Sequence, residues 1–182
     1  MNRYSIQPRL ECPSGYSDLF VFHTSTARML GHNFPCSIGS AGLRRNKIEG
    51  DCAVPCGVWQ IEQVLYRADK IPRPRTCVPV FPIHRWMCWC SDPQSKLYNT
   101  LIHEKNLTIG ERLFRNDNLY DCIAILNYNR PNAILGKGSA IFLHIWRRPH
   151  YPTKGCIAFS KTHLLWILAA WRPYSSVSAE NR

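Results

Sequence analysis

Long apolar runs are missing from this 182-residue sequence. The most apolar late run, residues 164–171, is far shorter than the roughly 20 residues that a membrane-spanning helix requires. Residues 1–13 include Arg3, Arg9 and Glu11 and have no continuous apolar core, so they do not form an ordinary secretory signal peptide. No internal repeat or low-complexity segment is present either. Taken alone, these absences predict a soluble cytoplasmic protein with no transmembrane segment.

Acidic residues are scarce. The 23 Lys and Arg residues outnumber the 12 Asp and Glu residues, which gives a net charge of +11. Such an imbalance favours a polyanionic partner, and nucleic acid, an anionic membrane surface and a carboxylate-rich cell wall are the three candidates. Charge alone does not choose among them. With 45% hydrophobic and 19% charged residues, the chain is expected to fold as one globular domain.

The paired Cys-x2-Cys spacing of structural zinc sites is absent. Cys52 and Cys56 are separated by three residues, and Cys88 and Cys90 by one, with His84 nearby. Neither spacing matches the zinc pattern, so we predict no metal site.

A phosphate-binding loop is also missing. Residues 136–139 read Gly-Lys-Gly-Ser, but Pro131 stands where the first glycine of such a loop should be. A strand pattern follows these residues instead of a helix. We therefore exclude nucleotide binding.

Cysteine, in contrast, is plentiful and odd in number. At least one of the nine residues cannot belong to an intramolecular disulfide, and a free thiol is what a cysteine enzyme needs. The alternative is that several are small buried hydrophobes. The nine are Cys12, Cys36, Cys52, Cys56, Cys77, Cys88, Cys90, Cys122 and Cys156.

Strand patterns dominate the chain, and one helix follows them. Strands are expected over residues 18–23, 27–38, 58–66, 119–128 and 140–145. Ser160 is a suitable N-cap and Pro173 ends the following apolar pattern, so we expect a helix over residues 160–172. The fold class is therefore mainly β, a small twisted sandwich or partly closed barrel with one C-terminal helix packed on the sheet.

The segments between these elements have their own signals. Four prolines in residues 67–82 exclude a helix and restrict any strand to a sheet edge. Residues 84–117 show no clear period, which favours a functional lid or groove wall. We divide the chain into an N-terminal arm (1–17), a catalytic domain (18–173) and a disordered tail (174–182).

The candidate catalytic residues stand at the ends of two short apolar runs. Residues 140–143 lead to His144, and after an Arg- and Pro-rich loop the sequence Thr-Lys-Gly-Cys opens a second run at Cys156. The two strand ends are expected to lie close together. A cysteine with a histidine beside it is the minimum equipment for nucleophilic acyl transfer. His150, in the loop, is the second-ranked base.

The residues around this pair have predicted roles. The amide groups of Gly155 and Cys156 could form an oxyanion hole. Lys154 and Arg147 would lower the thiol pKa and attract substrate carboxylates, unless they form only a solvated basic loop. Trp89 and Tyr98 could line a substrate groove, the alternative being a hydrophobic cluster under a long loop.

The order strand, His144, loop, Thr-x-Gly-Cys156, apolar run and helix resembles the catalytic segment of the YkuD-type L,D-transpeptidases, which cross-link bacterial peptidoglycan. Residues 47–59 are similar to that family's turn into an aromatic strand, and the resemblance extends over residues 18–171. The sequence departs from the common pattern at three positions. Lys154 replaces a second His, Ala158 an Arg or Asn, and Ile145 a Gly, which suggests a compact branch of the family.

The resemblance implies a YkuD-type β-sandwich in which Cys156 is the nucleophile, His144 is the base and the Ile145 carbonyl orients that base. It implies peptidoglycan stem peptides as substrate, a cell-envelope or periplasmic location, a monomer, no cofactor and no nucleic acid. That location conflicts with the missing signal peptide. Two rivals stay open: an L,D-carboxypeptidase or endopeptidase that uses the same residues, and an inactive basic module that binds wall polymer or nucleic acid.

Overall fold

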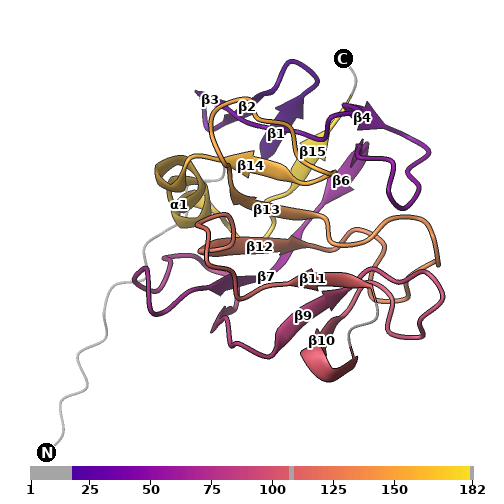
Figure 1. Cartoon of the computed structure of the whole chain (residues 1–182). Helices are drawn as coiled ribbons and strands as arrows, with labels where there is room; N and C mark the ends of the chain where they lie inside the picture. The colour runs from indigo at the N-terminus through magenta and orange to yellow at the C-terminus, as the bar shows by residue number, and fades with distance from the viewer. Residues whose placement is uncertain (1–17, 107–108, 181–182) are drawn as a thin grey trace, which may run out of the picture.

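A computed structural model describes residues 18–106 and 109–180, and most of its regular structure is β-strand. Two five-stranded sheets form the body of the molecule (Figure 1). The first sheet has the order β3-β2-β1-β15-β6, with β1 Leu19–Phe22, β2 Thr26–Met29, β3 His32–Pro35, β6 Gly57–Trp59 and β15 Val177–Ala179. The second, called the central sheet, has the order β14-β13-β12-β7-β8, with β7 Ile61–Tyr66, β8 Val80–Pro82, β12 Cys122–Leu126, β13 Phe142–Ile145 and β14 Ile157–Phe159.

Smaller elements complete the fold. A three-stranded sheet, called the cap sheet, has the order β10-β9-β11, with β9 Met87–Cys90, β10 Leu101–His103 and β11 Gly110–Arg112. The remaining elements are the strand pair β4 Leu43–Arg44 and β5 Val54–Pro55, the 3-10 turn η1 Glu104–Asn106 and the helix α1 Lys161–Ala170. No sheet of the described residues closes into a barrel, so the architecture is a β-sandwich. Of the two predicted forms, the sandwich is confirmed and the partly closed barrel is not.

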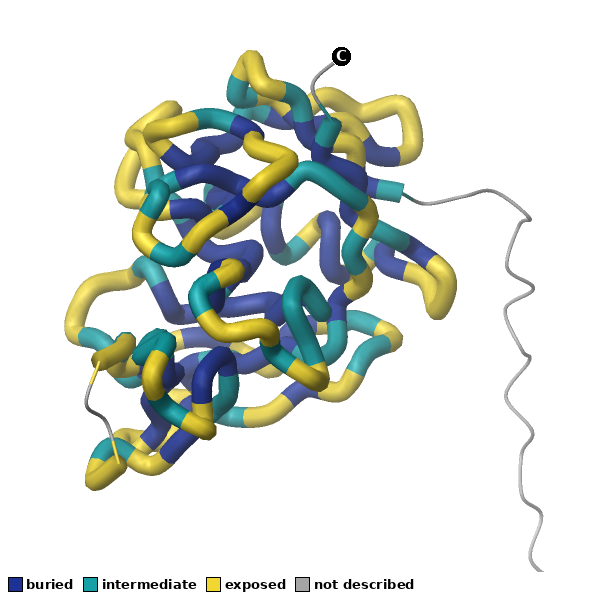
Figure 2. Tube along the Cα trace, turned by 90° about the vertical axis from the view of Figure 1, so that its right-hand side faces the viewer, coloured by how far each residue is buried: buried dark blue, intermediate teal, exposed yellow. Residues whose placement is uncertain are grey.

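The central sheet is covered on both faces because its strands are apolar on both sides. In β12, Ala124 points to one core, and Ile123 and Ile125 point to the other. A strand buried on both faces shows a continuous apolar run instead of an alternation, and all five residues of β12 are buried. The buried segments lie in the interior and the exposed segments form the surrounding loops (Figure 2).

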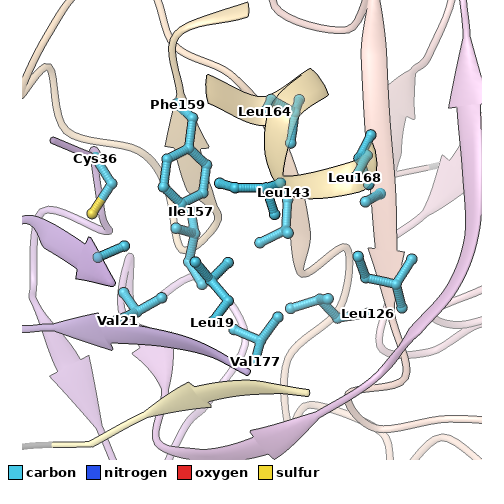
Figure 3. Packing of buried hydrophobic residues seen from close by; sticks show 14 of the residues in the cluster. Leu19, Val21, Cys36, Leu126, Leu143, Ile157, Phe159, Leu164, Leu168 and Val177 are labelled. Atoms are coloured by element: carbon cyan, nitrogen blue, oxygen red, sulfur yellow. The ribbon is translucent and has the colours of Figure 1, made fainter. Parts of the chain in front are cut away.

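The first core lies between the first sheet, the central sheet and α1. Figure 3 shows side chains from all three meeting there. The labelled residues are Leu19, Val21, Cys36, Leu126, Leu143, Ile157, Phe159, Leu164, Leu168 and Val177. We call this the sandwich core.

The second core lies between the central sheet and the cap sheet. Ile123 and Phe142 of the central sheet pack with Met87 and Trp89 of β9 and with Leu113. Residues 84–117, expected to form a lid or groove wall, build a sheet with its own apolar face, and Glu111 and Arg115 of this segment line the cavity described below. The strands of this sheet are only three or four residues long, too short to show a period in the sequence.

The C-terminal helix is confirmed with slightly shorter bounds than expected. The Ser160 Oγ accepts a hydrogen bond from the His163 N–H at 3.0 Å, which is the N-cap contact that the sequence predicted. Leu164, Ile167 and Leu168 are buried against the sandwich core. The helix thereby packs on β13 and β14, the two strands that approach the candidate site.

Two expected strands are each divided in two. Residues 27–38 contain β2 and β3, joined by a turn at Leu30 and Gly31, both with positive φ. Residues 58–66 contain β6 and β7, which belong to different sheets and break at Gln60. The edge strand allowed among the prolines is confirmed, because β8 pairs only with β7 at the margin of the central sheet.

The expected disordered tail is wrong for residues 174–180. Strand β15 lies inside the first sheet between β1 and β6, and its Val177 and Ala179 are fully buried. The Asp18 carboxylate accepts hydrogen bonds from the Ser176 N–H at 2.8 Å and from the Ser176 hydroxyl at 2.9 Å. The folded unit thus extends beyond the boundary expected at residue 173. The expected arm, residues 1–17, lies outside the described residues.

No helix within the described ranges is long and apolar enough to span a membrane.

Candidate active site

Strands β13 and β14 place His144 and Cys156 on the same face of the central sheet. The two strands are parallel, and His144 pairs with Ala158, so Cys156 precedes that register point by two residues. Side chains two residues apart share a face and are separated by about 6.6 Å along the strand. Phe142, beside Cys156, belongs to the core under the cap sheet. The imidazole and the thiol therefore face the cap sheet, away from the sandwich core.

Both groups line one cavity of about 460 Å³. Its walls come from four parts of the chain: the segment after β3, the loop before β5, the cap sheet with the segment that follows it, and the 146–154 loop. The lining residues are Ser40, Cys52, Glu111, Arg115, Leu119, Tyr120, His144, Trp146, Arg147, Tyr151, Pro152, Thr153, Lys154, Cys156 and Ala158. The sequence prediction that the imidazole and the thiol meet in space agrees with this arrangement.

The His144 imidazole is buried and oriented. Its Nδ1 lies 2.8 Å from the carbonyl oxygen of Ile145, and because a carbonyl can only accept, Nδ1 carries the proton. The Tyr120 ring meets the imidazole edge to face, with 5.5 Å between centroids. Burial lowers the pKa of His144 to about 4, even though the bond to Ile145 raises it. The imidazole is therefore neutral at pH 7, with Nε2 available as a base.

The Cys156 thiol is also neutral at rest. It donates to the carbonyl oxygen of Ala140, with 3.1 Å between the sulfur and the oxygen. Burial raises the pKa of Cys156 to about 12, and the carboxylate of Glu111 contributes in the same direction. The expectation that Lys154 and Arg147 lower this pKa is not met. Both side chains are exposed, where water screens their charge.

The turn before Cys156 is fixed by Thr153. Its hydroxyl donates to the Cys156 carbonyl at 2.6 Å and accepts from the Gly155 N–H at 3.2 Å. Because the Gly155 N–H already donates to Thr153, it is not free to donate to an oxyanion, which is the role that the sequence predicts for it. Gly155 has a φ of +132°, and a Cβ there would lie 2.9 Å from the Ala53 carbonyl oxygen. A side chain at position 155 would therefore push the nucleophile out of place.

The loop at residues 47–53 supports this turn from behind. The Asp51 carboxylate accepts from the Lys47 Nζ at 2.5 Å and from the Ala53 N–H at 3.0 Å. Burial alone would raise the pKa of Asp51, but these hydrogen bonds and the Lys47 charge lower it on balance. At Gly39, a Cβ would lie 2.2 Å from the Cys52 carbonyl oxygen. The loop is therefore held against the backbones of both Gly39 and Gly155.

Two residues expected in the substrate groove lie elsewhere. Trp89 is 1% exposed, and its Nε1 donates to Asn99 Oδ1 at 3.0 Å inside the cap-sheet core. Tyr98 is 2% exposed, and its hydroxyl donates to Glu49. The prediction that Trp89 and Tyr98 line the groove is wrong, because their rings are used to hold the cap sheet to the body.

The expected basic residues do reach the site. Arg147 and Lys154 line the cavity, whereas His150 is exposed and outside it. The guanidinium of Arg147 stacks over the Tyr151 ring at 5.3 Å. Of the two histidines considered for the base, only His144 therefore faces the thiol.

Three cavity residues were not found by sequence reasoning. Glu111 comes from β11, and Arg115 and Tyr120 come from the segment that connects β11 to β12. The Tyr120 hydroxyl donates to the Glu111 carboxylate. Nothing in the local sequence indicates these residues, because they reach the site only through the folding of the cap sheet.

Cys88 and Cys90, whose spacing was compared with a zinc site, do not form one. Cys88 and Cys90 are buried in a small cluster with Ile102. Over residues 18–106 and 109–180, no three His, Cys, Asp or Glu side chains gather as a metal site would require.

A β-sandwich that holds a buried histidine and a cysteine in one cavity has the form of a cysteine-dependent enzyme. The chain belongs to the YkuD family, whose model, described as the L,D-transpeptidase catalytic domain, matches residues 20–178. A search of curated proteins finds no match to this chain. The matched range ends inside β15, in agreement with the structural extent of the domain.

Proposed function

We propose that the protein is an L,D-transpeptidase that acts on peptidoglycan stem peptides through a thioester on Cys156. The observation that carries this proposal is the placement of Cys156 and His144 on one face of the central sheet, in one cavity, with His144 Nδ1 held by the Ile145 carbonyl. Family membership supports the choice of acyl transfer over other thiol chemistry.

The first half-reaction forms the thioester. The Cys156 sulfur attacks the carbonyl between an L-centre and a terminal D-residue, and His144 Nε2 takes the thiol proton. The Cys156 N–H donates to the developing oxyanion, since the Gly155 N–H is bound to Thr153. When the tetrahedral intermediate collapses, His144 returns its proton to the leaving amine of the D-residue.

The second half-reaction resolves the thioester. An acceptor amine attacks the acyl carbonyl, His144 accepts a proton from its nitrogen, and the thiolate leaves and recovers that proton. His144 can serve as a base in both halves because burial keeps it neutral. The proton therefore moves only when substrate is in place, and no ion pair has to exist beforehand.

The rim of the cavity is basic. Arg147 and Lys154 are exposed there and have no carboxylate partner among the described ion pairs. They are suited to guide the carboxylates of a stem peptide toward the site. We propose that the protein acts as a monomer. We place this activity in the cell envelope, where such a substrate is found, and propose that it requires no metal or organic cofactor.

The test is mass spectrometry of the products formed from a purified tetrapeptide muropeptide and an amine. A cross-linked or amine-exchanged product, with an acyl adduct trapped on Cys156, is expected. Hydrolysed tripeptide alone would support the carboxypeptidase or endopeptidase reading. If no adduct forms, while salt-sensitive binding to wall polymer or nucleic acid persists after thiol blockade, the protein is a binding module.

A further inference from the structure

The catalytic cavity carries charges of both signs. Glu111 and Arg115 come from the cap sheet and the segment that follows it, and Arg147 and Lys154 come from the 146–154 loop. Glu111 is the one carboxylate among the cavity-lining residues that the structure describes. Because Cys156 and His144 are neutral at rest, they do not compensate the Glu111 charge.

Glu111 is held in place without a direct ion pair. The hydroxyl of Tyr120 donates to its carboxylate, and Tyr120 is itself 7% exposed and locked between Phe142 and His144. None of the ion pairs formed by residues 18–106 and 109–180 includes Glu111. The charge of the nearby Arg115 interacts with Glu111, but the Arg115 guanidinium is bound to Asp117 through its Nη2 at 2.5 Å and through its Nε at 2.9 Å.

The Glu111 charge reaches the reacting atoms. It contributes to the raised pKa of Cys156 and of Tyr120, which places it within electrostatic range of the sulfur. For the first half-reaction this is unfavourable, because a nearby carboxylate opposes formation of a thiolate. The step that a negative charge here can favour is the second half-reaction, in which the acceptor arrives.

We infer that Glu111, positioned by Tyr120, is the residue that recognises the acceptor as an ammonium ion and selects aminolysis over hydrolysis of the Cys156 thioester. This inference rests on the proposed function. The acceptor amine arrives protonated, as a lysine-like side chain is at neutral pH. It pairs with the Glu111 carboxylate beside the thioester, where water has no such anchor.

The proton balance of the step follows from this arrangement. The ammonium transfers one proton to Glu111 and becomes a free amine. The amine nitrogen then forms the new C–N bond, its second proton passes to His144 Nε2, and the C–S bond breaks. The departing sulfur takes the proton from His144, and Glu111 releases its proton to water. Acyl transfer therefore ends with the cavity in its starting charge state.

The test compares two acceptors on the acyl-enzyme formed from a stem tetrapeptide. Nα-acetyl-lysinamide carries an ammonium ion at neutral pH, whereas hydroxylamine is uncharged there. In Glu111→Gln, the KM for Nα-acetyl-lysinamide should rise by about 10-fold or more, while use of hydroxylamine changes by less than about twofold. Acylation of Cys156 should become somewhat faster, because the charge that opposes the thiolate is gone.

Matched variants complete the design. Glu104→Gln removes a carboxylate from the same region, but Glu104 pairs with Arg112 at 2.5 Å outside the cavity, so both acceptors should behave as in the wild type. Tyr120→Phe keeps the ring and removes the hydroxyl donor to Glu111. It should raise the KM of the charged acceptor by about threefold and leave that of hydroxylamine unchanged.

Three results separate the possibilities. If Glu111→Gln acylates normally and uses both acceptors as the wild type does, the inference about Glu111 is wrong and the proposed function stands. An equal loss with both acceptors, in Glu111→Gln and Tyr120→Phe alike, also overturns it, since Glu111 would then only support the fold. If Cys156 of the wild type is never acylated by the stem tetrapeptide, the proposed function is wrong, and the inference about Glu111 is wrong as well.

Discussion

The two faces of the central sheet are built on different principles. Leu143 and His144 are neighbours in β13, yet Leu143 points into the sandwich core and His144 into the catalytic cavity. The first face is sealed by apolar side chains from the first sheet and α1. The second face has its own apolar core under the cap sheet, and beside that core lies the catalytic cavity, whose parts are held by hydrogen bonds and close backbone contacts. Activity should therefore depend on the second face, whereas truncations on the first face should lower stability and leave activity unchanged.

Cys156→Ser should have the largest effect on turnover, and it changes only the cavity face. Turnover should fall on the order of 1,000-fold or more, because an alcohol is much harder to deprotonate than a thiol. The melting temperature should change little. The comparison uses product formation per folded molecule, with Cys56→Ser as a control outside the cavity. Substantial turnover in Cys156→Ser would mean that another residue is the nucleophile.

Asp51→Asn tests whether the polar support of the cavity face also matters for stability. The side chains of Asp51 and Lys47 are 2% and 4% exposed, so removing one charge leaves the other buried and unpaired. A loss of roughly 3–5 kcal/mol in the free energy of unfolding is expected. Chemical denaturation measures this loss. As a control, Glu104→Gln breaks the exposed pair of Glu104 with Arg112 and should lower the free energy of unfolding by less than about 1 kcal/mol. Equal small losses in both would show that the loop at 47–53 is held by its backbone alone.

Leu143→Ala acts on the opposite face at the residue next to His144. Because Leu143 is fully buried, truncation should lower the free energy of unfolding by roughly 2–5 kcal/mol. At a temperature where the variant is folded, turnover per folded molecule should stay within about threefold of the wild type. A large loss of turnover in the fully folded variant would show that the two faces are coupled through β13.

His144→Gln should remove most turnover, because His144 is the proposed base, and its separate effect on stability appears only as a pH dependence. Burial lowers the pKa of His144 from 6.5 to about 4, so between these values the unfolded chain binds more protons than the folded one. Stability must then fall as the pH falls from 6.5 toward 4, by at most about 3 kcal/mol from this group.

The Gln variant lacks that contribution, so it should lose less stability than the wild type on acidification. The exposed His150→Gln is the matched control and should follow the wild type. Thermal melting across pH 7 to 4 measures the difference. Parallel curves for His144→Gln and the wild type would mean that His144 titrates like an exposed imidazole.

The sequence predicts the parts of the molecule whose signal is local. The strand before His144, the Gly155-Cys156 turn and the N-cap at Ser160 are each marked by neighbouring residues, and the structure has all three. The sandwich class follows from the same short apolar runs. These are the parts that depend on backbone propensity and apolar periodicity.

The sequence does not predict contacts that join distant segments. Glu111 and Tyr120 reach Cys156 only because the cap sheet folds over the central sheet, and β15 is ordered only because it finds β1 at the other end of the domain. The sequence favours a groove position for Trp89, because an aromatic residue in a segment without a clear period resembles a binding residue. Its burial depends on Asn99 and Phe142, which the local sequence does not link to it.

The neutral resting state of Cys156 also bears on how the protein survives oxidants. Peroxides attack thiolates, and the ladder from sulfenic to sulfonic acid begins with the ionised sulfur. With a pKa near 12 and its proton directed at the Ala140 carbonyl, the sulfur offers such reagents very little thiolate at neutral pH. Ionisation is deferred until a substrate carbonyl lies beside His144. We therefore expect Cys156 to react with peroxide more slowly than an exposed cysteine when no substrate is bound.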